Sequence, residues 1–111
     1  MTVQDVVEKL KLTVYSGSQG LTNTVTGGYT SDLLSDVMGH ADAGYLWITL
    51  QAHKNVIAIA SLKELAAILL VKGITPDEDM QNLSNQEGIP VLGSDLQAFE
   101  LSGETYALIK N

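Results

Sequence analysis

Cysteine and arginine are both missing from this 111-residue chain. Without cysteine there can be no disulfide scaffold, cysteine nucleophile, zinc finger or iron–sulfur site. Without arginine the chain lacks the bidentate clamp that proteins use for phosphate and carboxylate groups. Its six basic residues, all lysines, oppose thirteen acidic ones, for a net charge of −7. Nucleic acids and anionic membranes attract clustered positive charge, so we expect neither as a partner.

Long apolar runs are missing as well. No stretch reaches the roughly 18–20 apolar residues that a membrane span needs. Residues 1–11 contain no signal-peptide core, and we therefore expect a cytoplasmic protein. With 45% hydrophobic and 17% charged residues, the composition is typical of one folded domain that covers residues 1–111.

The second half of the chain carries the clearest strands. Residues 45–50 are mostly apolar on both faces, as in a strand that is covered on both sides, and residues 67–71 and 89–92 predict two more strands. The stretch between the first two is ambiguous. Residues 56–60 fit a strand followed by a short helix with Ser61 and Glu64 as its capping box, whereas residues 53–65 fit one buried helix. We favour the helix because it makes a simple strand–helix–strand crossover.

The first half predicts a strand over residues 11–15, a polar loop over 16–23 and a β-branched run over 24–26 that Gly27-Gly28 ends. Helices are predicted from their capping residues. The expected starts are Thr2 with Asp5, Thr30 or Ser31, Thr75 with Pro76, and Ser94, and the expected stops are Gly39, Gly88 and Gly103. A terminal turn over residues 104–109 follows the last stop.

This alternation of strands and helices predicts the α/β class: a single small domain with a mostly parallel sheet and helices packed on it. Trp47 and Phe99 are expected in the core or at an interface, and Met38 and Met80 as fillers of gaps in the core.

The pair Gly27-Gly28 precedes a predicted helix, where free N–H groups can bind an anion. A plain turn is the simpler interpretation, and Asp32 in the first turn of that helix would repel phosphate. Neither a P-loop nor a dinucleotide-binding glycine motif occurs in the chain.

Asp32, Asp36 and His40 are spaced as metal ligands on one helix edge could be. Because Gly39 is expected to end the helix before His40, solvated carboxylates are the simpler interpretation and we expect no metal site. His53 follows the strongest strand, where α/β folds bind ligands, although a surface histidine is the alternative. We find no serine–histidine–acid set or paired carboxylates, and so expect no enzyme.

Residues 25–38, Val-Thr-Gly-Gly-Tyr-Thr-Ser-Asp-Leu-Leu-Ser-Asp-Val-Met, resemble the DRTGG domain family, and the resemblance continues over residues 46–49, 53–60, 76–78 and 87–92. It thus covers nearly the whole chain. The namesake motif is altered, because Thr24 and Val25 stand where the family has aspartate and arginine.

The resemblance implies a small α/β unit similar to the N-terminal domain of HPr kinase/phosphorylase, without the kinase P-loop. DRTGG domains also occur in regulatory regions of pyrophosphatases and beside phosphotransacetylases, often with CBS domains. It therefore implies a non-catalytic regulatory or sensory module without a cofactor. A serine-kinase activity is not implied, since the residues for phosphoryl transfer are missing.

We expect this module to bind a small ligand such as an adenine nucleotide and to signal to a metabolic enzyme partner. The candidate ligand-binding residues are Thr26, Gly27, Gly28, Tyr29, Ser31, Asp32 and His53. The alternative is a protein-interaction module that works as a homodimer or as an assembly subunit, which needs only an exposed apolar face.

Overall fold

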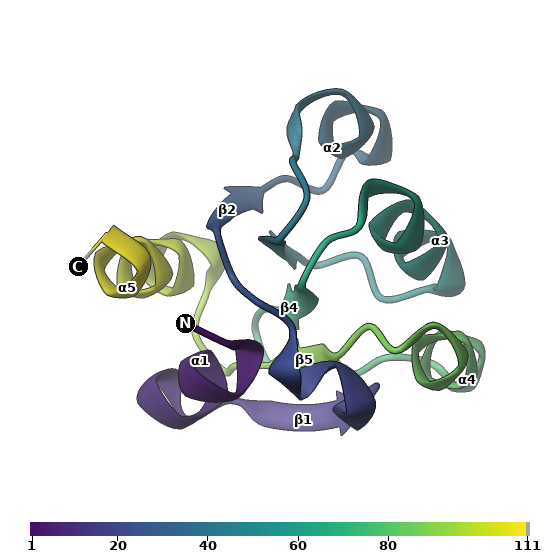
Figure 1. Ribbon diagram of the computed structural model, residues 1–111, viewed down its shortest axis with the longest axis horizontal. Coiled ribbons are helices and arrows are strands. Elements are labelled where there is room, and N and C mark those ends of the chain that lie inside the picture. The colour runs from purple at the N-terminus through teal and green to yellow at the C-terminus, as the bar shows by residue number, and fades with distance from the viewer. Residues whose placement is uncertain (111) are drawn as a thin grey trace.

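Strands and helices alternate along most of the chain, as Figure 1 shows for the computed structural model, which describes residues 1–110. The strands are β1 (Thr13–Ser16), β2 (Gly27–Thr30), β3 (Tyr45–Thr49), β4 (Ala67–Leu70) and β5 (Val91–Gly93). The helices are α1 (Val3–Leu10), α2 (Leu34–His40), α3 (Lys54–Lys63), α4 (Glu78–Glu87) and α5 (Ala98–Lys110), with a short 3₁₀ helix, η1 (Ser18–Thr22).

All five strands form one sheet in the order β1-β5-β4-β3-β2. Neighbours from β2 to β5 are parallel, and β1 joins β5 antiparallel at one edge. The mostly parallel α/β sheet predicted from the sequence is confirmed. No described helix is long and apolar enough to cross a membrane.

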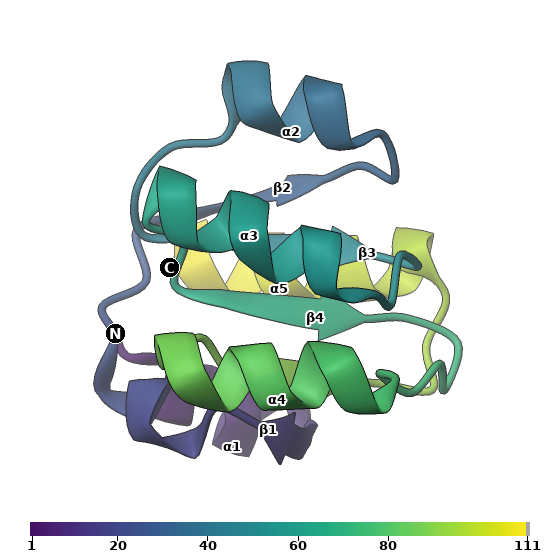
Figure 2. The same ribbon diagram turned by 90° about the vertical axis from the view of Figure 1, so that its right-hand side faces the viewer.

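Helices cover both faces of this sheet (Figure 2). On one face α1 and α5 pack on Leu46 and Leu69, and on the other α2, α3 and α4 pack on Trp47 and Ile68. Successive residues of β3 and β4 thus enter opposite cores, which is why both strands are apolar on both faces. Trp47 is fully buried, as expected.

Two predicted helices are confirmed by their ends. Thr2 and Asp5 form the predicted capping box at α1, in which each side chain accepts a hydrogen bond from the other residue's N–H. Of the two alternatives for residues 53–65, the helix is correct. Glu64 is the left-handed residue that ends α3, so no second capping box forms at Ser61.

The prediction that Gly27-Gly28 forms a turn after a strand over residues 24–26 is wrong. The two glycines are the first residues of β2, in register with Tyr45 and Leu46 of β3. The strand forms there because β3 offers a long apolar partner, and the pairing overrides the low intrinsic preference of glycine for strands. The strand predicted over residues 11–15 lies slightly later, at β1, and the predicted polar loop contains η1.

Several helix ends differ from the prediction, among them the start of the last helix, which is Ala98 and not the residues after Ser94. Thr30 belongs to β2, and Leu33 is the N-cap of α2 without a side-chain bond. Gly39 lies inside that helix, which continues to His40. At α4 the cap is Asp77, whose carboxylate accepts a hydrogen bond from the Met80 N–H at 2.8 Å, and not Thr75.

The prediction that Gly103 stops the last helix is also wrong, since α5 runs through it to Lys110. A glycine inside a helix costs about 1 kcal/mol. Burial of Leu101 and Thr105 on either side of Gly103 offsets that cost and keeps the helix intact. Phe99 on this helix is 86% exposed, so it is not a core residue.

Candidate functional site

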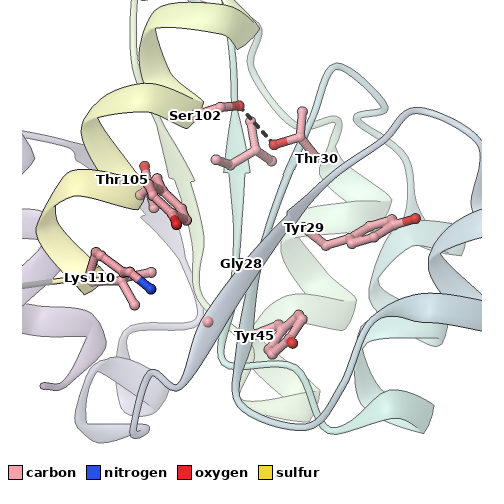
Figure 3. A pocket seen from close by; sticks show the side chains of 11 residues that line it. Gly28, Tyr29, Thr30, Tyr45, Ser102, Thr105 and Lys110 are labelled. Atoms are coloured by element: carbon pink, nitrogen blue, oxygen red, sulfur yellow. Dashed lines mark hydrogen bonds between the residues drawn. The ribbon is translucent and has the colours of Figure 1, made fainter.

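A pocket of about 490 Å³ lies between β2 and α5 (Figure 3). The strand side is formed by Gly27, Gly28, Tyr29 and Thr30, with Tyr45 and Ile48 from β3. The helix side is formed by Ser102, Thr105, Tyr106, Ile109 and Lys110. The pocket therefore joins two segments that lie at opposite ends of the chain.

Gly28 opens the pocket. Side chains alternate between the two faces of a strand, and Gly28 and Thr30 share the α5 face with their register partners Leu46 and Ile48. A Cβ atom at Gly28 would meet only the backbone oxygen of Leu46, at 3.6 Å. The missing side chain thus leaves space between the edge strand and the helix.

Gly27 has a different role. A Cβ atom at this position would lie 2.6 Å from Cε1 of Tyr45, which is closer than real Cβ contacts come. Glycine here therefore lets the Tyr45 ring lie against the strand, at the end of the pocket where β2 begins. The two adjacent glycines serve the same site in two ways, one by admitting an aromatic ring and one by leaving space.

The helix side forms a stripe at helical spacing: residues 102, 105, 106, 109 and 110. The Ser102 and Thr30 hydroxyls lie 2.8 Å apart and close one end of the pocket. At the other end, Nζ of Lys110 lies 5.9 Å from the ring centroid of Tyr106, within range of a cation–π contact.

Among residues 1–110, Lys110 is the charged residue of this lining and none of the lining residues is acidic. In a chain with a net charge of −7, this is a local exception. The pocket combines the Tyr106 ring, neutral hydroxyls and one ammonium group. Such a surface suits an aromatic ligand that carries an anionic group.

A second group of polar side chains lies at the carboxyl ends of β2 and β3. Oδ1 of Asp32 accepts hydrogen bonds from the Thr49 hydroxyl and the Leu50 N–H, each at 2.9 Å. Nε2 of Gln51 donates to the Asp32 backbone oxygen at 3.0 Å, and the His53 ring contacts Oε1 of Gln51 at 3.2 Å. These bonds tie two loops together.

Tyr29, Asp36 and His40 form a third group beside α2. The Tyr29 hydroxyl donates to both Asp36 carboxylate oxygens at 2.9 Å, and Nδ1 of His40 lies 3.1 Å from Oδ1. Hydrogen bonds from Ser31 and Tyr29 lower the pKa of Asp36, and the bond to Asp36 raises the pKa of Tyr29. Because α2 continues through Gly39, His40 does reach Asp36, contrary to the prediction.

Asp32 is turned instead toward β3, so the three residues at metal-ligand spacing do not converge. Within residues 1–110, no group of three or more acidic or histidine side chains could hold a metal ion.

The structure thus separates the candidate residues named from the sequence. Gly27, Gly28 and Tyr29 line the pocket, although the Tyr29 ring points away from it toward α2 (Figure 3). The others lie outside it: Ser31, Asp32 and His53 at the strand ends, and Thr26, whose hydroxyl donates to the Ala43 backbone oxygen at 3.0 Å.

The sequence does not predict the pocket residues of α5 or Tyr45 of β3. Residues 102, 105, 106, 109 and 110 have the spacing of one helix face. Gly103 hides this signal, because a glycine at that position predicts a helix stop.

No protein-family model and no curated protein matches the chain. A solved structure does: the CBS and DRTGG domains of the regulatory region of a Clostridium perfringens pyrophosphatase, complexed with its activator diadenosine tetraphosphate. The TM-score is 0.69 at 10% identity, over 95% of this chain and 46% of that one. The chain thus spans less than half the length of the matched structure. At this identity the likeness concerns the fold alone: the chain is similar in fold to part of this CBS and DRTGG region.

Proposed function

We propose that this chain is a regulatory module that binds an adenine nucleotide in the pocket between β2 and α5 and signals its presence to a partner enzyme. The observation that carries the proposal is the pocket itself. It is large enough for a small molecule, and it presents a lysine without any acidic neighbour in its lining.

The lining offers a contact for each part of a nucleotide. Tyr106 provides an aromatic face on which a base can stack. The hydroxyls of Thr30 and Ser102 can exchange hydrogen bonds with a ribose or with the edge of a base. Lys110 supplies the positive charge for a phosphate. The matched pyrophosphatase region binds diadenosine tetraphosphate, which makes adenine nucleotides the first ligands to test.

The same lining favours binding over catalysis. A hydroxyl nucleophile needs an adjacent base, and no histidine or acidic side chain lies among the lining residues that the structure describes. The Thr105 hydroxyl donates to the Leu101 backbone oxygen at 2.7 Å, and Ser102 is paired with Thr30. A bound ligand would therefore act by changing how α5 packs on the sheet. A partner could sense the ligand at α5.

Isothermal titration calorimetry with AMP tests the proposal, using wild-type protein and two variants. Gly28→Leu places a side chain in the pocket, and Gly39→Leu makes the same change on α2, where a Cβ atom meets nothing within 4 Å. We expect wild type and Gly39→Leu to bind equally and Gly28→Leu to bind at least tenfold more weakly. Absence of heat with AMP, ADP, ATP and diadenosine tetraphosphate would contradict the proposal.

A protein-interaction module is the second candidate, and two exposed aromatic side chains of α5 favour it. Phe99 is 86% exposed and Tyr106 66%, and both lie on one helix face with Gly103 between them. This face would form a homodimer or dock the chain into a larger assembly. Sedimentation of wild type and Phe99→Ser without ligand tests this function, together with a pull-down. A wild-type dimer that the Phe99→Ser substitution dissociates supports it. A wild-type protein that sediments as a monomer and recovers no partner in the pull-down contradicts it.

A further inference from the structure

We infer that the pocket between β2 and α5 selects a nucleoside monophosphate and discriminates against nucleotides with longer phosphate chains. This inference rests on the proposed function, because it specifies the ligand of the same pocket. Its basis is the number and position of the charges that surround the phosphate.

The described part of the pocket lining offers one cation. Lys110 is the charged lining residue, and the rest of the lining is neutral. A phosphate monoester carries about −1.5 to −2 charges at pH 7, so a single ammonium group already leaves it incompletely neutralised. Each further phosphate adds negative charge without meeting another lysine in the lining.

The net charge of the chain adds to this limit. Lys110 is the one positively charged side chain among the described lining residues. The chain as a whole carries a net charge of −7. A longer phosphate chain should therefore meet more repulsion than a single phosphate does.

The opposite end of the pocket does not provide an alternative place for phosphate. Thr30 and Ser102 close it with neutral hydroxyls, and Ile48 adds an apolar surface. These groups suit the uncharged nucleoside, so the ligand lies with its single phosphate at Lys110. A dinucleoside polyphosphate has no short anionic end to place there.

Calorimetry with adenosine, AMP, ATP and diadenosine tetraphosphate, in buffer without divalent cations, tests the inference. We expect AMP to bind at least tenfold more tightly than ATP and diadenosine tetraphosphate. The difference should shrink between 50 and 300 mM salt, because the repulsion is screened. If ATP or the dinucleotide binds as tightly as AMP, the inference is overturned while the proposed function stands. If none of the four binds, the proposed function itself fails.

A pair of variants isolates the lysine. Lys110→Met removes the charge and keeps an unbranched side chain, whereas Lys63→Met in the last turn of α3 removes the same charge far from the pocket. We expect Lys110→Met to weaken AMP binding at least fivefold and to leave adenosine binding unchanged, and Lys63→Met to affect neither. Equal AMP affinity in the two variants would overturn the inference.

Discussion

Valine at Gly28 and valine at Gly27 should change stability in opposite directions. A Cβ atom at Gly28 would make one ordinary contact, at 3.6 Å from the Leu46 oxygen, and would point into the pocket. A Cβ atom at Gly27 would come within 2.6 Å of the Tyr45 ring, which would have to move. Neither glycine has a positive φ, so the backbone itself accepts valine at both positions.

The expected magnitudes follow from these contacts. Replacing a strand glycine removes conformational freedom from the unfolded chain and stabilises the fold by about 0.5–1 kcal/mol. For a domain of this size that raises the melting temperature of Gly28→Val by about 2–4 °C. At Gly27 the same gain is outweighed by overpacking, which costs about 1–3 kcal/mol. Gly27→Val should therefore melt below wild type.

Thermal melts and urea denaturation of the two variants, without ligand, measure both changes. A Gly28→Val protein that is clearly less stable than wild type would refute the claim that the strand faces open space there. A Gly27→Val protein as stable as wild type would refute the claimed contact with Tyr45. The two outcomes are independent, so each glycine is tested separately.

Three further predictions concern the rest of the fold. Hydrogen bonds lower the pKa of Asp36 from its ordinary value of 3.8. The ionised carboxylate therefore stabilises the fold above that pH, and this stabilisation is lost as the pH falls through the folded-state pKa. In urea melts, Asp36→Asn should be less stable than wild type at pH 7 and closer to wild type at pH 2.5. Gly17 and Gly88 both have φ near +70°, but a Cβ atom at Gly17 would overlap the Ile89 oxygen, whereas at Gly88 the nearest atom is 3.5 Å away. Gly88→Ala should lower the free energy of unfolding by about 1–2 kcal/mol, and Gly17→Ala should lower it distinctly more. Equal losses in the two variants would contradict the close contact at Gly17. Ser84 is fully buried and donates to the Ile89 oxygen at 2.6 Å; Ser84→Ala should cost about 1–3 kcal/mol in denaturant titrations, and a neutral substitution would contradict the bond.

Sequence patterns predicted the fold class because its signals are local. The apolar run at β3, the capping box at Thr2 and the strand–helix crossover through α3 each depend on a few neighbouring residues. Errors arose where contacts distant in sequence decide the local structure. Gly103 remains helical because its neighbours Leu101 and Thr105 are buried, and the glycine itself gives no sign of this.

The pocket residues, too, divide into those that a local motif predicts and those that depend on contacts distant in sequence. Gly27, Gly28 and Tyr29 could be named from their motif, but what Gly28 does depends on Ser102 and Lys110, which the fold brings opposite it. No pattern within β2 indicates that α5 lies opposite it. The spacing of the lining residues on α5 would have revealed a helix face, though not which strand it covers.

Amide chemical shifts in a ¹⁵N–¹H titration with AMP locate the bound ligand residue by residue. If AMP binds between β2 and α5, the largest shifts fall on these two elements, at residues such as Gly28, Thr30, Ser102 and Lys110. Ligands of parallel α/β sheets commonly bind at the carboxyl ends of the strands. Shifts concentrated at those ends, at Ser31, Asp32 and His53, would show that AMP does not bind in the pocket between β2 and α5.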